Sequence, residues 1–119
     1  MFFKIKNHAE LQLALEGLSG FLLERAVSAE RIFDSKLVAC ELIGNVLKHA
    51  EGVAELRGEI KDGFLEMKII SDNAFAFPQT VLCSDVYSEH GRGLFLVKQI
   101  CNERIYSESD GIKVLIELI

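Results

Sequence analysis

Two short turn sequences constrain the fold of this 119-residue chain more than any other feature. Asp62-Gly63 separates two runs in which apolar and polar residues alternate, and this arrangement is the strongest local signal for a β-hairpin. Ser109-Asp110-Gly111 separates a second pair of strand-like runs in the same way. Each pair predicts two neighbouring antiparallel strands. The four runs are 53–61, 64–71, 104–107 and 112–119.

Three other stretches have the apolar spacing of helices. Asn7, three residues before a glutamate, can cap the first helix, although Gly17 and Gly20 each lower helix propensity by about 1 kcal/mol relative to alanine. Ser28 can cap the second helix and Gly52 can end it. The expected helices are 7–25, 28–52 and 93–102, with a short strand at 2–6 and a long loop at 72–90.

This order of elements predicts an α+β fold. We expect a two-layer α/β sandwich in which a mixed, mostly antiparallel sheet carries helices on one face. The regular alternation of strands and helices that a doubly wound parallel sheet requires is absent from the sequence. Because half of the 119 residues are hydrophobic, we expect one domain, residues 1–119, around a single core.

Charge and composition argue against several classes of protein. The chain has 13 basic and 18 acidic residues, and no two Lys or Arg are adjacent, so we expect no nucleic-acid binding. Its longest stretch without Asp, Glu, Lys or Arg is 73–84, far shorter than the ~20 apolar residues that span a bilayer. Lysines within residues 1–6 interrupt the apolar run that a signal peptide needs, so we expect a cytoplasmic protein without membrane attachment.

The three cysteines, Cys40, Cys83 and Cys101, are odd in number and too far apart for a CxxC knuckle. A zinc site that adds a distant histidine is one alternative. Reduced thiols in the core of a cytosolic protein are the favoured interpretation.

A polar stripe follows one side of the expected second helix, opposite its broad apolar face. The stripe consists of Asp34, Glu41, Asn45, Lys48 and His49. One interpretation is an ordinary solvated face. The other is a site, because a carboxylate, an amide and an ammonium on consecutive turns offer a proton acceptor, an oxygen ligand for a hard cation and a positive charge for phosphate.

Two further features have both a structural and a functional interpretation. Asp72 stands where a strand ends and a loop begins, so it can be a turn former or can accept a hydrogen bond from a buried amine such as that of adenine. Gly91 and Gly93 precede an apolar helix, so they can form a simple loop-to-helix turn or bring backbone N–H groups to phosphate oxygens. The glycine pair is neither a Rossmann fingerprint nor a Walker loop.

In this order, the three features resemble the histidine-kinase-like ATPase superfamily, whose nucleotide-binding fold is called the Bergerat fold. Residues 39–50 are similar to its N box, 71–78 to its first glycine box and 90–98 to its second. The resemblance covers roughly residues 28–119. Within the superfamily, the chain resembles the bacterial anti-sigma-factor serine kinases in its small size and in the amino-acid sequences of its N box and second glycine box.

The resemblance implies a site for ATP and Mg²⁺. Glu41 would be the general base that takes a proton from a serine hydroxyl of a partner protein, or from water. Asn45 would coordinate the Mg²⁺ that bridges the phosphates, and Lys48 would neutralise phosphate charge. Asp72 would accept a hydrogen bond from the adenine amino group.

The second glycine box would form part of the lid over the nucleotide. Gly91 and Gly93 would supply its flexible backbone, Arg92 would lie near the phosphates, and Leu94 continues the box. The implied protein partners are a sigma factor, which the chain would sequester, and an anti-sigma-factor antagonist, which it would phosphorylate. Relatives form a homodimer through the N-terminal strand and first helix, and we expect a homodimer here.

The first glycine box departs from the family pattern, because Ala74 and Ala76 stand where relatives have glycines. Each added methyl restricts φ and occupies space where the backbone approaches the nucleotide. Two functions therefore remain open. The chain is either a serine/threonine protein kinase or a nucleotide-independent switch of the same fold that acts by protein contact; an unrelated α/β domain with chance motif matches is a third alternative.

Overall fold

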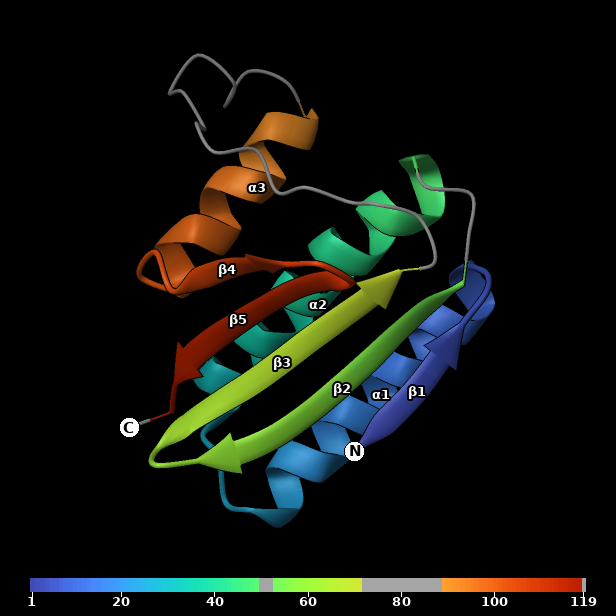
Figure 1. Ribbon diagram of the computed structural model, residues 1–119. Coiled ribbons are helices and arrows are strands. Elements are labelled where there is room, and N and C mark those ends of the chain that lie inside the picture. The colour runs from blue at the N-terminus through green and yellow to red at the C-terminus, as the bar shows by residue number, and fades with distance from the viewer. Residues whose placement is uncertain (50–52, 72–88, 119) are drawn as a thin grey trace.

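The computed structural model describes residues 1–49, 53–71 and 89–118, of which 48, 49 and 89–94 are considered by their backbone alone. Five strands and three helices follow one another along these residues (Figure 1). The elements are β1 (Phe2–Ile5), α1 (His8–Glu24), α2 (Ala29–His49), β2 (Ala54–Lys61), β3 (Phe64–Ser71), α3 (Glu89–Ile100), β4 (Ile105–Glu108) and β5 (Gly111–Glu117).

The strands form one open sheet in the order β1-β2-β3-β5-β4. Both expected hairpins are confirmed: β2 pairs with β3 and β4 pairs with β5. Asp62 and Gly63 both have positive φ, 54° and 82°, as the tight turn between β2 and β3 requires. These turns keep the register that places alternate side chains on opposite faces of the sheet.

Every strand pair in the described part of the chain is antiparallel, so the expectation of a mixed sheet was wrong. The reason is the position of β4. A direct crossover from β3 through α3 would place a parallel strand beside β3. Instead β4 lies at the edge of the sheet, and its hairpin turn brings β5 back, antiparallel, to pair with β3.

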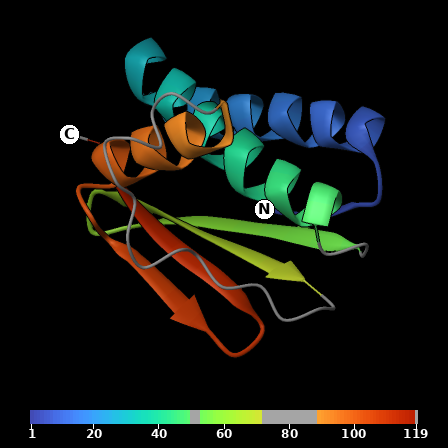
Figure 2. The same cartoon turned by 90° about the horizontal axis from the view of Figure 1, so that it is seen from above.

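The helices lie together on one face of the sheet, as expected for an α+β fold of two layers (Figure 2). Helix α2 contacts both α1 and α3, and it also packs on β2 and β3. The core between the layers is built from alternate residues of the central strands and from the buried sides of the helices. Its members include Leu65, Met67 and Ile69 of β3, Ile112, Val114 and Ile116 of β5, and Leu11, Leu15, Leu18 and Leu22 of α1.

Helix α1 begins where the sequence predicts. The Asn7 side chain accepts a hydrogen bond from the Glu10 N–H at 2.9 Å, and Glu10 Oε1 accepts one from the Lys6 N–H at 2.7 Å. Gly17 has a packing role inside this helix, because a Cβ at that position would overlap the ring of Phe3 on β1. The missing side chain therefore lets α1 and the edge strand approach closely.

Helix α3 begins at Glu89, four residues before the expected start at 93, and it ends at Ile100. The expected loop at 72–90 is therefore too long at its C-terminal end, and its other residues lie outside the described ones. No helix in the described ranges 1–49 and 89–100 is long and apolar enough to cross a membrane.

Candidate functional site

The polar stripe of α2 is not a solvated face where its side chains are described. Asp34 and Glu41 are half-buried, and Asn45 is only 5% exposed. At about 100° per residue, Asn45 projects about 40° from Glu41, at the border of the buried side that contains Val38 and Leu42. The side chains of Lys48 and His49, on the next turn, lie outside the described residues.

Asn45 differs from the other buried polar residue of this helix. The hydroxyl of Ser35, which is fully buried, donates a hydrogen bond to the Arg31 carbonyl at 2.7 Å. Among the described residues, the Asn45 side chain makes no hydrogen bond. Its amide atoms are not fully buried, since Glu108 Oε1 is the one fully buried side-chain N or O atom without a hydrogen-bond partner among the described residues, so the Asn45 oxygen and its two N–H donors are available to a bound group. An amide oxygen is a suitable ligand for a hard cation such as Mg²⁺.

Glu41 lies one helical turn before Asn45, which places the two side chains about 6 Å apart on one side of α2. Within the described part of the chain, its carboxylate forms no ion pair. Burial raises the pKa of the neighbouring Cys40 thiol, and the negative charge of Glu41 raises it further. Among the described side chains no cation is paired with this half-buried carboxylate, which leaves its oxygens available to a bound group.

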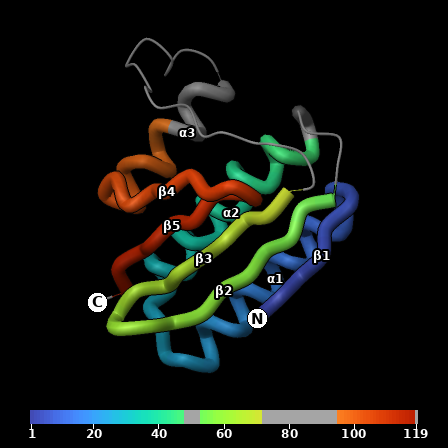
Figure 3. The backbone as a smooth tube through the Cα atoms, viewed as in Figure 1, coloured from blue at the N-terminus to red at the C-terminus, as the bar shows by residue number. Residues whose placement is uncertain are grey.

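The last turns of α2 and the end of β3 lie at the same end of the molecule (Figures 1 and 3). Ala54, at the start of β2, pairs directly with Ser71, the last residue of β3, and Ser71 is 8% exposed. The Ser71 N–H donates a hydrogen bond to the Asp110 carbonyl at 3.1 Å. A Cβ at Gly111 would overlap the Ile69 carbonyl oxygen, so β5 begins in close contact with β3. These contacts fix the end of β3.

The three positions of the first glycine box, Asp72, Ala74 and Ala76, lie outside the described residues. Asp72 is bonded directly to Ser71. The pairing of Ser71 with Ala54 therefore fixes where the chain enters this box.

The second glycine box lies inside a helix rather than in front of one. The backbones of Gly91, Arg92, Gly93 and Leu94 all belong to α3, so the expected loop-to-helix junction at this pair was wrong. The cost of the two glycines, about 1 kcal/mol each, is offset by packing of the helix through residues such as the fully buried Val97. Helix α3 contacts α2, so this box still belongs to an element next to the polar stripe.

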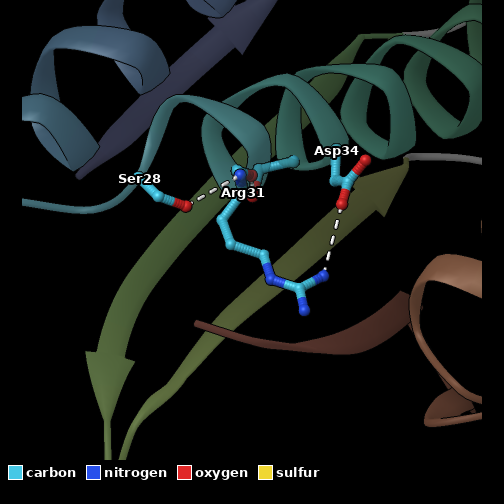
Figure 4. A network of polar contacts seen from close by, with 4 residues as sticks. Ser28, Arg31 and Asp34 are labelled. Atoms are coloured by element: carbon cyan, nitrogen blue, oxygen red, sulfur yellow. Dashed lines mark hydrogen bonds and ion pairs between the residues drawn. The ribbon is translucent and has the colours of Figure 1, made fainter. Parts of the chain in front are cut away.

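The sequence analysis did not single out Arg31, which extends the stripe toward the start of α2 (Figure 4). Its N–H donates to the Ser28 hydroxyl at 3.3 Å, which confirms Ser28 as the cap of this helix. Its guanidinium lies 3.3 Å from Asp34, and both side chains are partly buried. The spacing of three residues between Arg31 and Asp34 is the sequence signal that could have found this ion pair.

The cysteines are placed differently from one another. Cys101 is fully buried, and burial raises the pKa of its thiol to about 12, so its expected place in the core is confirmed. Cys40 is half-buried, and Cys83 lies outside the described residues. No group of three or more His, Cys, Asp and Glu that could hold a metal ion is present among the residues that the structure describes. Neither a comparison with models of known protein families nor a search of curated proteins finds a match.

Proposed function

We propose that the chain is an ATP-binding regulatory protein with the Bergerat fold of the histidine-kinase-like ATPases, acting as a cytoplasmic serine/threonine protein kinase on an anti-sigma-factor antagonist. The observation that carries the proposal is Asn45, a residue 5% exposed whose side chain has no hydrogen-bond partner among the described residues. Such an amide lies largely inside the fold without a commitment to another described group, and coordination of a cation would give its oxygen a partner.

The fold supports the proposal. A strand, two helices, a hairpin, a helix and a second hairpin follow in the order that the sequence pattern predicts. The helices cover one face of an antiparallel sheet (Figure 2). This arrangement brings the last turns of α2 to the same end of the molecule as the strand end that leads into Asp72.

Each residue then has one task. ATP with Mg²⁺ would supply the phosphoryl group that is transferred. The Asn45 side-chain oxygen would hold the cation, Lys48 would neutralise phosphate charge and Asp72 would orient the adenine. The Glu41 carboxylate would remove the proton from the serine hydroxyl of the substrate protein. Phosphoryl transfer depends chiefly on positioning and charge compensation, so this small set of groups suffices.

A second candidate function is a contact-dependent switch of the same fold that does not use nucleotide. Two observations favour it. Ala74 and Ala76 replace the glycines of the first box. Gly91 and Gly93 lie within α3, where helical hydrogen bonds hold a backbone that a lid would need to move. In this function the chain would bind a sigma factor or its antagonist without phosphorylating either.

Titration calorimetry of the purified chain with Mg-ATP and Mg-ADP distinguishes the two functions. The kinase proposal requires binding on the order of micromolar Kd, and Asp72→Asn should weaken it without lowering the Tm of the nucleotide-free chain. If no heat of binding appears at millimolar nucleotide, the kinase proposal is wrong and the contact-dependent switch replaces it.

A further inference from the structure

In the described part of the chain, no helix covers the face of the sheet that lies opposite the helices (Figures 1 and 2). Alternate residues of β1, β2 and β3 point to this face, because their neighbours along each strand point into the core. A hollow of about 360 Å³ lies here across the three strands, and we call it the open-face hollow. Its lining includes Met1, Phe2, Arg57, Glu59, Glu66 and Lys68.

Two consecutive cross-strand pairs in the open-face hollow join like charges. Arg57 of β2 lies directly opposite Lys68 of β3, and Glu59 of β2 lies directly opposite Glu66 of β3. Like charges at directly opposite positions destabilise a sheet, whereas a cation opposite a carboxylate stabilises it. An exchange of Arg57 and Glu59 would make both pairs favourable. The observed order instead gives the hollow a positive end and a negative end, at a cost in stability.

The positive end keeps free bonding capacity at Arg57. One guanidinium nitrogen of Arg57 lies 3.5 Å from Glu55, but the side chain is 57% exposed, so the rest of its planar fork of donors is accessible. Lys68 is held by Glu108 at 3.2 Å and by Asp110 at 3.1 Å, neither of which lines the hollow. Arg57 is therefore the side chain of the positive end that is better placed to pair with a bound carboxylate.

The negative end lacks a close cation. Glu59 is exposed and forms no ion pair with any side chain that the structure describes. Glu66 has Lys113 as its partner at 3.9 Å, which is long for an ion pair. The Met1 amino group donates a hydrogen bond to the Gly58 carbonyl at 2.9 Å and pairs with neither carboxylate. The negative end is thus open to a positively charged group.

An aromatic ring borders the open-face hollow. Phe2 of β1 is 53% exposed and lies directly opposite Arg57, whose guanidinium carbon is 5.5 Å from the centre of the ring. Such a ring offers apolar surface on which a ligand side chain can pack. Ligand pockets range from about 300 to 1,000 Å³, so a hollow of about 360 Å³ has the size for a small molecule.

We propose that the open-face hollow binds a free α-amino acid with an apolar side chain. The ligand carboxylate pairs with Arg57, its ammonium group pairs with Glu59 and Glu66, and its side chain packs on Phe2. The two charged pairs are about 7 Å apart along the strands, and the long Arg and Glu side chains can reach two ligand groups joined by one carbon. Helix α2 lies on the other face of the sheet, so this proposal does not depend on the proposed function.

Matched ligands test the role of each ligand group. L-Phenylalanine is the probe, and the NMR chemical shifts of the backbone amides of the untagged chain measure its Kd. We expect a Kd on the order of 1 mM, because exposed ion pairs are weak. L-Phenylalanine amide lacks the carboxylate, N-acetyl-L-phenylalanine lacks the ammonium group and glycine lacks the apolar side chain. Each of these three compounds should bind at least about fivefold more weakly.

Matched variants locate the site. Arg57→Gln and Glu59→Gln should each raise the Kd of L-phenylalanine at least about fivefold. Lys61→Gln and Glu117→Gln remove the same charges from exposed positions on this face that do not line the hollow, so the Kd should stay within about twofold of the wild-type value. In Arg57→Gln, L-phenylalanine and its amide should bind equally, because the carboxylate has lost its partner. Circular dichroism verifies that the four variants are folded.

Three results would each overturn the proposal. The first is the absence of chemical-shift changes at about 10 mM L-phenylalanine. The second is equal affinity of the wild-type chain for L-phenylalanine and for its amide and N-acetyl analogues. The third is an equal loss of affinity in Arg57→Gln and Lys61→Gln, which would mean that binding follows the overall charge of the chain and not the open-face hollow.

Discussion

Replacing Asn45 by leucine should stabilise the nucleotide-free protein while abolishing its nucleotide binding. The two side chains branch at the same carbon, so leucine occupies nearly the same space without polar atoms. Asn45 is 5% exposed and has no hydrogen-bond partner among the described residues, but its polar atoms are not fully buried, so the unpaired amide costs only about 1 kcal/mol, the low end of the usual range. Leucine also has a higher helix propensity, by a few tenths of a kcal/mol.

Together these effects predict a gain of about 1 kcal/mol in the free energy of unfolding. For a chain of this length, 1 kcal/mol corresponds to roughly 4 °C in Tm, so Asn45→Leu should raise the Tm by about 4 °C. Thermal unfolding followed by circular dichroism in nucleotide-free buffer measures the shift.

Ser35→Ala is the matched control on the same helix. Ser35 is also buried, but its hydroxyl already donates a hydrogen bond within the helix. Loss of that bond and the better helix propensity of alanine nearly cancel, so its Tm should change by only about 2 °C. A fall in the Tm of Asn45→Leu would refute the reasoning, because it would mean that the amide stabilises the fold. A rise in Tm with unchanged ATP affinity would refute the assignment of Asn45 as a ligand.

Three further predictions follow from individual contacts. Glu41→Ala should leave Mg-ATP affinity nearly unchanged while phosphate transfer to the partner protein is lost. Calorimetry measures the affinity and a phosphorylation assay measures the transfer. Loss of both nucleotide binding and transfer would assign Glu41 a structural role instead. Gly17→Ala should lower the free energy of unfolding by about 2 kcal/mol, because its methyl group would overlap the Phe3 ring. Gly20→Ala should raise the free energy of unfolding by about 1 kcal/mol, because a Cβ at position 20 meets no atom within 4 Å and alanine has the higher helix propensity. Urea unfolding measures the free energy of unfolding of each glycine variant. The same change in Gly17→Ala and Gly20→Ala would contradict the packing of β1 on α1. Lys68, 3.1 Å from Asp110, holds the pKa of that carboxyl below its ordinary value by a hydrogen bond. Asp110 therefore binds a proton more readily in the unfolded chain than in the folded one. The stabilisation is present at neutral pH and is lost as the pH falls through the ordinary carboxyl range. The difference in urea midpoint between wild type and Asp110→Asn should therefore be smaller at about pH 3 than at about pH 7. An equal difference at the two pH values would contradict the stabilising role of this ion pair.

The features predicted correctly from the sequence are those fixed by neighbouring residues. The Asp62-Gly63 turn and the caps at Asn7 and Ser28 each depend on a few consecutive side chains, and all three are present. The strand order could not be predicted from neighbouring residues, because the place of β4 at the edge of the sheet depends on contacts between distant parts of the chain. Nothing local distinguishes that arrangement from one with a parallel neighbour for β3.

The start of α3 and the burial of Asn45 were missed for a related reason. The glycine pair at 91 and 93 indicates a loop by propensity alone, but packing of the helix on α2 outweighs a cost of about 1 kcal/mol per glycine. A helical wheel places Asn45 at the border of the apolar side, and only the neighbouring elements decide whether a border position is buried.

The central claim is that the Asn45 amide holds the Mg²⁺ of a bound nucleotide, and the metal dependence of ATP binding tests it most directly. ATP affinity should be measured by titration calorimetry for the wild type and for Asn45→Leu, each with Mg²⁺ and with the metal removed by a chelator. The account predicts that Mg²⁺ strengthens ATP binding to the wild type by at least about tenfold and has no effect on what binding remains in the variant. An equal effect of Mg²⁺ on both proteins would contradict it.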